Sequence, residues 1–355
     1  MEYQSLFEDI SLVLLYGGVT MLNLVAGLYL LLRRGNAISP QVTPPTRLRI
    51  WAAAFLFVAT LSHVSWAYYT YHYSPEAYLI LSGLDVLLII PTIAGFLLSM
   101  LQDRRRSVWP VVAMLAPVAV LLALSLSRED NMLITWLSTY VIALFVLFML
   151  YMFFAVRRYG RWLKDNYADL ENKEIWQSLL FLAVFLLFFM LYSGTTDNPV
   201  LVYLLQIDNL VIVGLVLWRV ETLQQLEENV QATADPAASA APTIPANFGP
   251  LLEKHCVQDQ LFLQHDLTLS QLAQVIGTNR SYLSQYFAQK GLTYNAYING
   301  LRIDHFIRLY HEAVASQRIF TAQQLAFESG FHSYSTFSSA FKQKMGKPVT
   351  EWMRS

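Results

Sequence analysis

The chain has 355 residues, of which 55% are hydrophobic and only 14% are charged. Because soluble globular domains carry about 25% charged residues, this composition excludes a protein that is soluble throughout. The single cysteine, Cys256, excludes an internal disulfide and a cysteine-based metal site. A formal net charge of −1 points to no class of partner, because it averages an apolar N-terminal half and an ordinary soluble C-terminal half.

The first 218 residues are dominated by seven apolar runs. Each run has roughly 18–25 residues, which is enough to cross a hydrocarbon core of about 30 Å. The runs cover residues 12–32, 49–71, 78–100, 109–126, 132–156, 175–193 and 199–218. The sequence therefore predicts a seven-helix transmembrane sensor domain over residues 1–218. We expect no cleavable signal peptide, because the leader before the first run is acidic rather than basic.

The loops between these runs predict the orientation of the chain. Thirteen Lys and Arg residues fall on one side, and Arg128 alone falls on the other. Because basic loops stay in the cytoplasm, we expect an N-terminus outside the cell and a cytoplasmic C-terminal part. The thirteen residues are Arg33, Arg34, Arg47, Arg49, Arg104, Arg105, Arg106, Arg157, Arg158, Arg161, Lys164, Lys173 and Arg219.

Three ionisable residues, His63, Asp85 and Asp208, interrupt the apolar runs. Counted from the outer ends of their runs, all three lie roughly 10–14 Å deep at 1.5 Å per residue. Ionisable groups inside a membrane are costly and mark functional sites, so the sequence predicts a polar sensor site open to the outside. The alternative is that these groups only hold helices together by hydrogen bonds. The aromatic run from Trp66 to Tyr73 fits either a belt at the membrane surface or the lining of such a site.

Residues 219–246 predict a stalk and a flexible linker. The first part, VETLQQLEENV from Val220, can continue the last apolar helix into the cytoplasm, either as a solvated helix end or as a short dimerising stalk. We favour the solvated helix end. The Ala- and Pro-rich segment that follows indicates a linker and a domain boundary.

Two segments of the C-terminal part resemble each other: TLSQLAQVIGTNRSYLSQYFAQKG from Thr268 and TAQQLAFESGFHSYSTFSSAFKQKMG from Thr321. Each begins with Thr-x-x-Gln, a capping box that starts a helix. Each continues with Leu-Ala and then a glycine, Gly277 or Gly330, which fits a tight helix-ending turn with positive φ. Each then has an apolar pair on one face of a second helix, Leu283 with Phe287 and Phe337 with Phe341.

A helix, a glycine turn and a second helix form the layout of a helix-turn-helix, whose second helix lies in the major groove of DNA. A long amphipathic helix over residues 295–315 connects the two copies. The sequence therefore predicts an all-α protein, in which a seven-helix transmembrane bundle is followed by a cytoplasmic all-helical domain with two helix-turn-helix motifs. We place that domain at residues 247–355.

Residues 247–355 resemble the DNA-binding domain of the AraC/XylS family of bacterial transcription regulators. Ser329 departs from the family pattern, which usually has a small apolar residue before Gly-Phe. The resemblance implies two recognition helices in successive major grooves on one face of double-stranded DNA. Because this family is bacterial, we expect the apolar runs to lie in a bacterial inner membrane. The matching residues are Leu272, Ala273, Gly277, Tyr282, Leu283, Phe287, Tyr297, Leu301, Arg302, Gly330, Phe331, Ser335, Phe337, Phe341, Lys342, Gly346 and Pro348.

The resemblance also implies which side chains meet DNA. Arg and Gln can bond the edges of guanine and adenine, and Ser or Thr can bond several bases, whereas phosphate contacts position the protein without reading sequence. The domain has 10 basic and 7 acidic residues, so we expect a modest non-specific affinity. The groove-facing positions would be Arg280, Ser281, Ser284, Gln285, Tyr334, Ser335, Thr336 and Ser339, and the phosphate contacts would be Lys342, Lys344, Lys347 and Arg302.

A DNA-binding domain held under a membrane would let an outside event alter transcription directly. We therefore expect a membrane-bound one-component transcription regulator that is not an enzyme and uses no cofactor or metal. Its partners would be double-stranded DNA, the lipid bilayer and a signal ligand. The alternative is a membrane transporter or enzyme with a regulatory cytoplasmic domain, although the sequence has no His-Glu-x-x-His, no Gly-x-Ser-x-Gly and no phosphate-binding glycine loop. Homodimerisation and proteolytic release of the DNA-binding half stay open.

Overall fold

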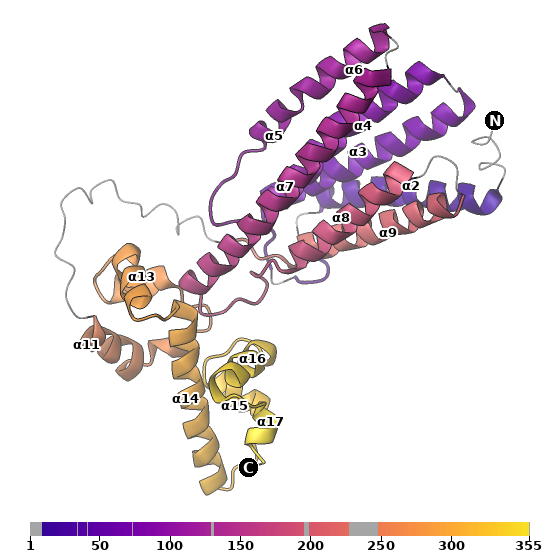
Figure 1. Ribbon diagram of the computed structural model, residues 1–355. Coiled ribbons are helices and arrows are strands. Elements are labelled where there is room, and N and C mark those ends of the chain that lie inside the picture. Colours follow the sequence, from indigo (N-terminus) through magenta and orange to yellow (C-terminus); the bar gives the residue numbers. More distant parts are fainter. Residues whose placement is uncertain are drawn as a thin grey trace. The chain divides into compact units, whose positions relative to one another are not determined.

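The computed structural model describes residues 9–33, 35–40, 42–72, 74–128, 131–194, 199–226 and 248–354. Within these ranges the protein is all-α, as predicted, and the extended backbone pairs at a single isolated antiparallel bridge, between Tyr167 and Thr268. The chain divides into two compact units (Figure 1). The first consists of Met1–Arg157 and Ile175–Leu226, and the second consists of Arg158–Glu174 and Glu227–Ser355.

The first unit is a bundle of long apolar helices. Its helices α2, α3 and α4 pack against one another in chain order, and α9 packs against α2 and α8. The helix α7 starts in this unit, while its last turns from Arg158 onward belong to the second. The helices are α2 (Ile10–Leu32), α3 (Thr46–Tyr71), α4 (Pro75–Ser99), α5 (Trp109–Met114), α6 (Ala116–Arg128), α7 (Asn131–Asn166), α8 (Gln177–Gly194) and α9 (Pro199–Thr222).

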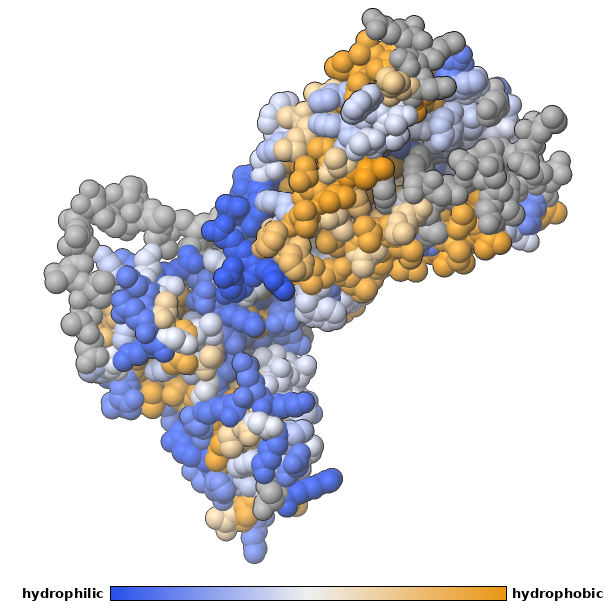
Figure 2. Space-filling model, in the orientation of Figure 1, coloured by the Kyte–Doolittle hydropathy of each residue, from blue (hydrophilic) through white to orange (hydrophobic). Residues whose placement is uncertain are grey.

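Each of the seven predicted apolar runs forms helix. Six described stretches are long and apolar enough to cross a membrane, whereas the described apolar part of α8, Gln177–Phe188, is shorter. The side chains of Leu14, Leu147 and Phe154 are between 62% and 69% exposed, and apolar side chains cover much of the visible surface of this unit (Figure 2). An exposed apolar surface of this extent is typical of contact with a lipid bilayer.

The junction after α9 differs from the expected helical stalk. The helix ends at Thr222, and Leu223, which would face water on a solvated stalk, is fully buried. The backbone N–H of Leu226 donates to the side-chain oxygen of Gln102 at 2.9 Å. Residues 223–226 therefore pack as the last part of the first unit. The rest of the predicted linker, residues 227–246, lies outside the described residues.

The second unit contains the two predicted helix-turn-helix motifs, α12 with α13 and α15 with α16. In both capping boxes the threonine hydroxyl accepts from the glutamine backbone N–H, and the glutamine side chain accepts from the threonine N–H. The helices and turns are α11 (Gly249–Leu252), a π-helical turn (Glu253–Gln258), a 3-10 turn (Leu261–Leu263), α12 (Leu269–Val275), α13 (Arg280–Gln289), α14 (Tyr294–Ala315), α15 (Ala322–Glu328), α16 (Tyr334–Met345) and α17 (Val349–Trp352).

The connecting helix α14 carries residues of two separate hydrophobic cores. Tyr294 and Ile298 pack in the core of the first motif, together with the predicted apolar pair of α13. Ile303 and Phe306 pack in the core of the second motif, together with the predicted pair of α16. One helix therefore holds both motifs, with α13 near its first half and α16 near its second (Figure 1).

The two turn glycines both have positive φ, as predicted, with +73° at Gly277 and +94° at Gly330. Gly330 is the more constrained of the two. A Cβ atom at Gly330 would lie 2.9 Å from the Cα of Leu263 and 3.1 Å from the carbonyl oxygen of Phe262, whereas nothing lies within 4 Å at Gly277. Because these neighbours are backbone atoms, they cannot rotate away. Gly330 thus lets the second motif approach the segment that precedes the first.

We predict that Gly277→Ala lowers the free energy of unfolding by roughly 1 kcal/mol, the cost of a left-handed alanine. Gly330→Ala should cost roughly 1–3 kcal/mol more, because overpacking adds to the strain. Cys256 provides the measurement: it is fully buried, and burial raises the pKa of its thiol to about 12, so maleimide should label it once the domain opens. The urea concentration at half-labelling should fall further for Gly330→Ala, and equal midpoints would contradict the close approach.

Candidate DNA-binding interface and intramembrane polar site

Each recognition helix begins at a side-chain cap. The Oδ1 atom of Asn279 accepts from the N–H of Tyr282 at 3.0 Å at the start of α13. The Oγ atom of Ser333 accepts from the N–H of Thr336 at 3.2 Å at the start of α16. The caps set where each helix starts, and the buried apolar pairs seat one face of each helix on its core. The opposite face of each helix is left to meet a partner.

Five of the predicted DNA-contacting side chains lie on these outer faces. Ser281 and Gln285 are exposed on α13, and Ser335, Ser339 and Lys342 are exposed on α16. Spacings of four and three residues put the members of each set on one side of a helix. Both recognition helices therefore present a row of hydrogen-bonding groups of the kind that reads base edges.

Three other predicted contacts are partly buried, which limits what they can reach. Tyr334 packs against the core of the second motif. The hydroxyl oxygen of Thr336 accepts a hydrogen bond from Ser333 at 3.1 Å, and Ser284 is half-buried on α13. Tyr334 and Thr336 therefore also stabilise the domain.

Arg280, the first residue of α13, is engaged within the protein. Its Nε atom donates to the Oδ1 atom of Asn166 at 2.6 Å. Burial lowers the pKa of the guanidinium, with Tyr167 and Asp165 acting in the opposite direction, but an arginine in a protein keeps its charge. This predicted base reader thus has a partner in residues 158–174 of its own chain.

The prediction that Arg302 contacts phosphate is wrong. Its side chain has no exposed surface, and its guanidinium donates to the carbonyl oxygens of Phe262 at 2.8 Å, Gln264 at 2.6 Å and His265 at 3.2 Å. Burial lowers the pKa of this guanidinium, as expected for a charge removed from water. Arg302 instead ties the segment before the first motif to α14.

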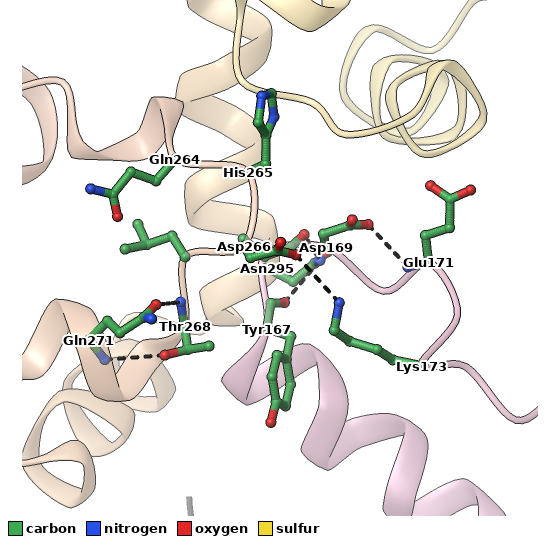
Figure 3. A network of polar contacts seen from close by, with 12 residues as sticks. Tyr167, Asp169, Glu171, Lys173, Gln264, His265, Asp266, Thr268, Gln271 and Asn295 are labelled. Carbon is green, nitrogen blue, oxygen red and sulfur yellow. Dashed lines mark hydrogen bonds and ion pairs between the residues drawn. The ribbon is translucent and has the colours of Figure 1, made fainter. Parts of the chain in front are cut away.

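The sequence did not predict that residues 158–174 would belong to this unit (Figure 3). Ala168 is fully buried in the core of the first motif, and the side-chain amide of Asn299 donates to its carbonyl oxygen at 3.2 Å. Asn299 was the residue in the sequence that could have indicated this contact, because an asparagine buried within a helix requires a polar partner. The amino-acid sequence does not say which residue is that partner.

Two of the three predicted intramembrane site residues are tied to aromatic neighbours in the first unit. The hydroxyl of Tyr16 donates to the backbone oxygen of His63 at 2.7 Å, and the ring centroids of these two residues are 4.9 Å apart. The indole N–H of Trp66 donates to a carboxylate oxygen of Asp85 at 2.6 Å. Trp66 therefore bonds a residue of the predicted site, and helices α2, α3 and α4 contribute to this polar cluster.

The third residue, Asp208, is buried on α9, and its Oδ2 atom has no hydrogen-bond partner among the described residues. Its neighbour Asn209 lines a small cavity together with His63, Ser62 and apolar side chains such as Phe185. The Nδ1 atom of His63 is likewise buried and unpaired within the described part of the chain. The cavity therefore offers hydrogen-bonding groups within a largely apolar wall.

Comparison with known proteins agrees with the geometry of the second unit. Residues 272–355 match a protein family described as a helix-turn-helix domain, and this stretch begins within α12 and contains both recognition helices. No curated protein and no solved structure matches the chain. The C-terminal part of this chain is therefore a DNA-binding helix-turn-helix domain of the AraC family.

Proposed function

We propose that the protein is a transcription regulator that binds specific DNA while it is anchored in the membrane. The observation that carries this proposal is the presence, in one chain, of an AraC-type DNA-binding domain and of helices long and apolar enough to cross a bilayer. The thirteen basic residues on one side of the apolar runs support a cytoplasmic location for the DNA-binding domain. A tethered domain of this kind acts on transcription without a separate phosphorelay.

We further propose that the first unit senses a signal at the polar cluster of Tyr16, His63, Trp66 and Asp85, with Asp208 and Asn209 contributing from α9. Ionisable groups are costly inside a membrane, which favours a functional role. The unpaired buried atoms of His63 and Asp208 support this role, because a ligand could bond them and a proton would neutralise the Asp208 carboxylate.

The proposed function predicts that the intact protein occupies discrete genomic sites. The full-length protein would be crosslinked to DNA in living cells, recovered with the membrane fraction, and the attached DNA sequenced. We expect sharp peaks near particular genes. An absence of peaks, with intact protein in the membrane, would contradict the proposal, and peaks carried by a soluble C-terminal fragment would replace tethered action with proteolytic release.

The matched control for this experiment replaces one exposed serine on each recognition helix with an acid, Ser281→Glu with Ser335→Glu. Both serines face solvent, so the fold should tolerate the change, while the added charges repel DNA phosphates. The control should reach the membrane at normal levels and lose the peaks.

Substitutions on the two recognition helices should separate base reading from phosphate binding. Gln285→Ala should relax the preference at one base pair by about 1–3 kcal/mol, because it removes a base-edge contact. Lys342→Ala should weaken binding to all sequences alike and reduce the slope of log affinity against log salt by about 1. Competitive binding of full-length protein to a set of duplexes with single base-pair changes, at several salt concentrations, measures both. If Gln285→Ala lost the same affinity for every duplex, Gln285 would not be a base-reading residue.

Removal of the intramembrane charges should abolish the response to the signal. Asp85→Asn retains an oxygen for the Trp66 indole but lacks the charge, so Asp85→Asn with Asp208→Asn tests charge more than shape. A reporter gene would be placed downstream of a DNA site recovered in the crosslinking experiment, and its expression followed across growth conditions. The amount of each variant in the membrane would be checked by immunoblot. The exposed Glu76→Gln on α4 is the control and should respond normally. A double variant that still responds fully would exclude these carboxylates from sensing.

A further inference from the structure

The end of α7 and the loop after it, residues 165–174, dock on the first helix-turn-helix motif (Figure 3). Tyr167 forms the antiparallel bridge with Thr268, the residue that caps α12. The side-chain amide of Asn295 donates to the carbonyl oxygens of Tyr167 at 3.2 Å and Ala168 at 2.7 Å. The segment thus contacts the start of the first motif and the start of the connecting helix α14.

The docked segment is also held by burial and by charge. Ala168 is fully buried in the core of the first motif. Lys173 is almost fully buried, and its ammonium lies 3.8 Å from the exposed carboxylate of Asp266. The segment therefore occupies a defined place on the domain.

The position of the docked segment matters because its residue Asn166 is hydrogen-bonded to the side chain of Arg280. In a helix-turn-helix the N-terminal residues of the recognition helix contact base edges, and Arg280 is the first residue of α13. Its Nε atom is bonded to Asn166, the last residue of α7. The Arg280 side chain is held half-buried at Asn166, so it would have to leave Asn166 before it could extend to a base edge in a groove.

We propose that residues 165–174 are a built-in inhibitor of the first helix-turn-helix motif, which holds Arg280 on Asn166 and must undock before that motif reads DNA. The docked segment includes the last residues of α7 and continues from them without an intervening linker, so a change in α7 would reach it directly. This inference rests on the DNA-binding part of the proposed function. It adds the regulation of that binding.

A disulfide across the bridge tests the inference, with full-length Tyr167→Cys/Thr268→Cys protein in lipid nanodiscs. Paired residues in an antiparallel bridge have Cα atoms about 4.5–5.5 Å apart, which suits a disulfide, and the buried Cys256 stays out of the reaction. The probe is a duplex selected from a random library with the reduced variant. The reduced and oxidised forms share one sequence, so the lost Thr268 cap affects both alike.

We expect the oxidised form to bind the selected duplex about tenfold more weakly than the reduced form, the size of one lost base contact. Addition of Arg280→Ala should remove most of this difference. Equal affinities of the oxidised and reduced forms would overturn the inhibitor, as would failure of the disulfide to form. Failure of the reduced variant to select any duplex would instead overturn the proposed function, and the inhibitor with it.

A second variant loosens the segment without a crosslink. Asn295→Ala removes the two hydrogen bonds to the backbone of Tyr167 and Ala168 and should bind the same duplex several-fold more tightly than the unmodified protein. The control is Gln258→Ala, an exposed amide at the end of the π-helical turn before the first motif, which should bind as the unmodified protein does. Weaker binding by Asn295→Ala than by the control would contradict inhibition.

Discussion

The arrangement of the DNA-binding domain depends on a buried arginine at the point where its two halves meet. Arg302 lies on α14 between the residues that enter the first core and those that enter the second. Its guanidinium satisfies three backbone carbonyl oxygens, and the ring of Phe331 from the second motif lies 5.7 Å away. A buried charge needs bonded partners, and the carbonyl oxygens that bond Arg302 all lie in the segment before the first motif, so the guanidinium restrains how that segment packs on α14. The spacing of the recognition helices follows from this constraint and from the backbone contact at Gly330.

A fixed spacing gives the domain a way to recognise a long DNA site within one chain. Two recognition helices on one rigid connector can enter successive major grooves, so recognition of both half-sites does not require a second copy. A regulator anchored in the membrane meets DNA only beneath the bilayer, and two linked contacts favour a correct site over the many incorrect ones. In this proposal the polar cluster in the first unit receives the signal, and the segment docked on the first motif restrains DNA binding by that motif.

Much of this structure could be predicted from the sequence because it rests on local patterns. Apolar length predicts the long helices, and the Thr-x-x-Gln boxes, Gly277 and the Leu283–Phe287 pair predict the first motif, since each needs only a few neighbouring residues. The burial of Arg302 and the docking of Ala168 could not be predicted in this way. Both depend on residues about 40 to 130 positions apart, and an arginine that bonds backbone carbonyls resembles, in sequence, one that bonds phosphates.

The central claim is that two rigidly linked recognition helices read one bipartite DNA site. Hydroxyl-radical footprinting of full-length protein in nanodiscs, on a selected duplex, tests it most directly. The account predicts two protected patches on the same face of the DNA, about one helical turn or 10 base pairs apart, with a spacing that is the same on every selected duplex. A single protected patch, or two patches whose spacing varies from one duplex to another, would contradict it.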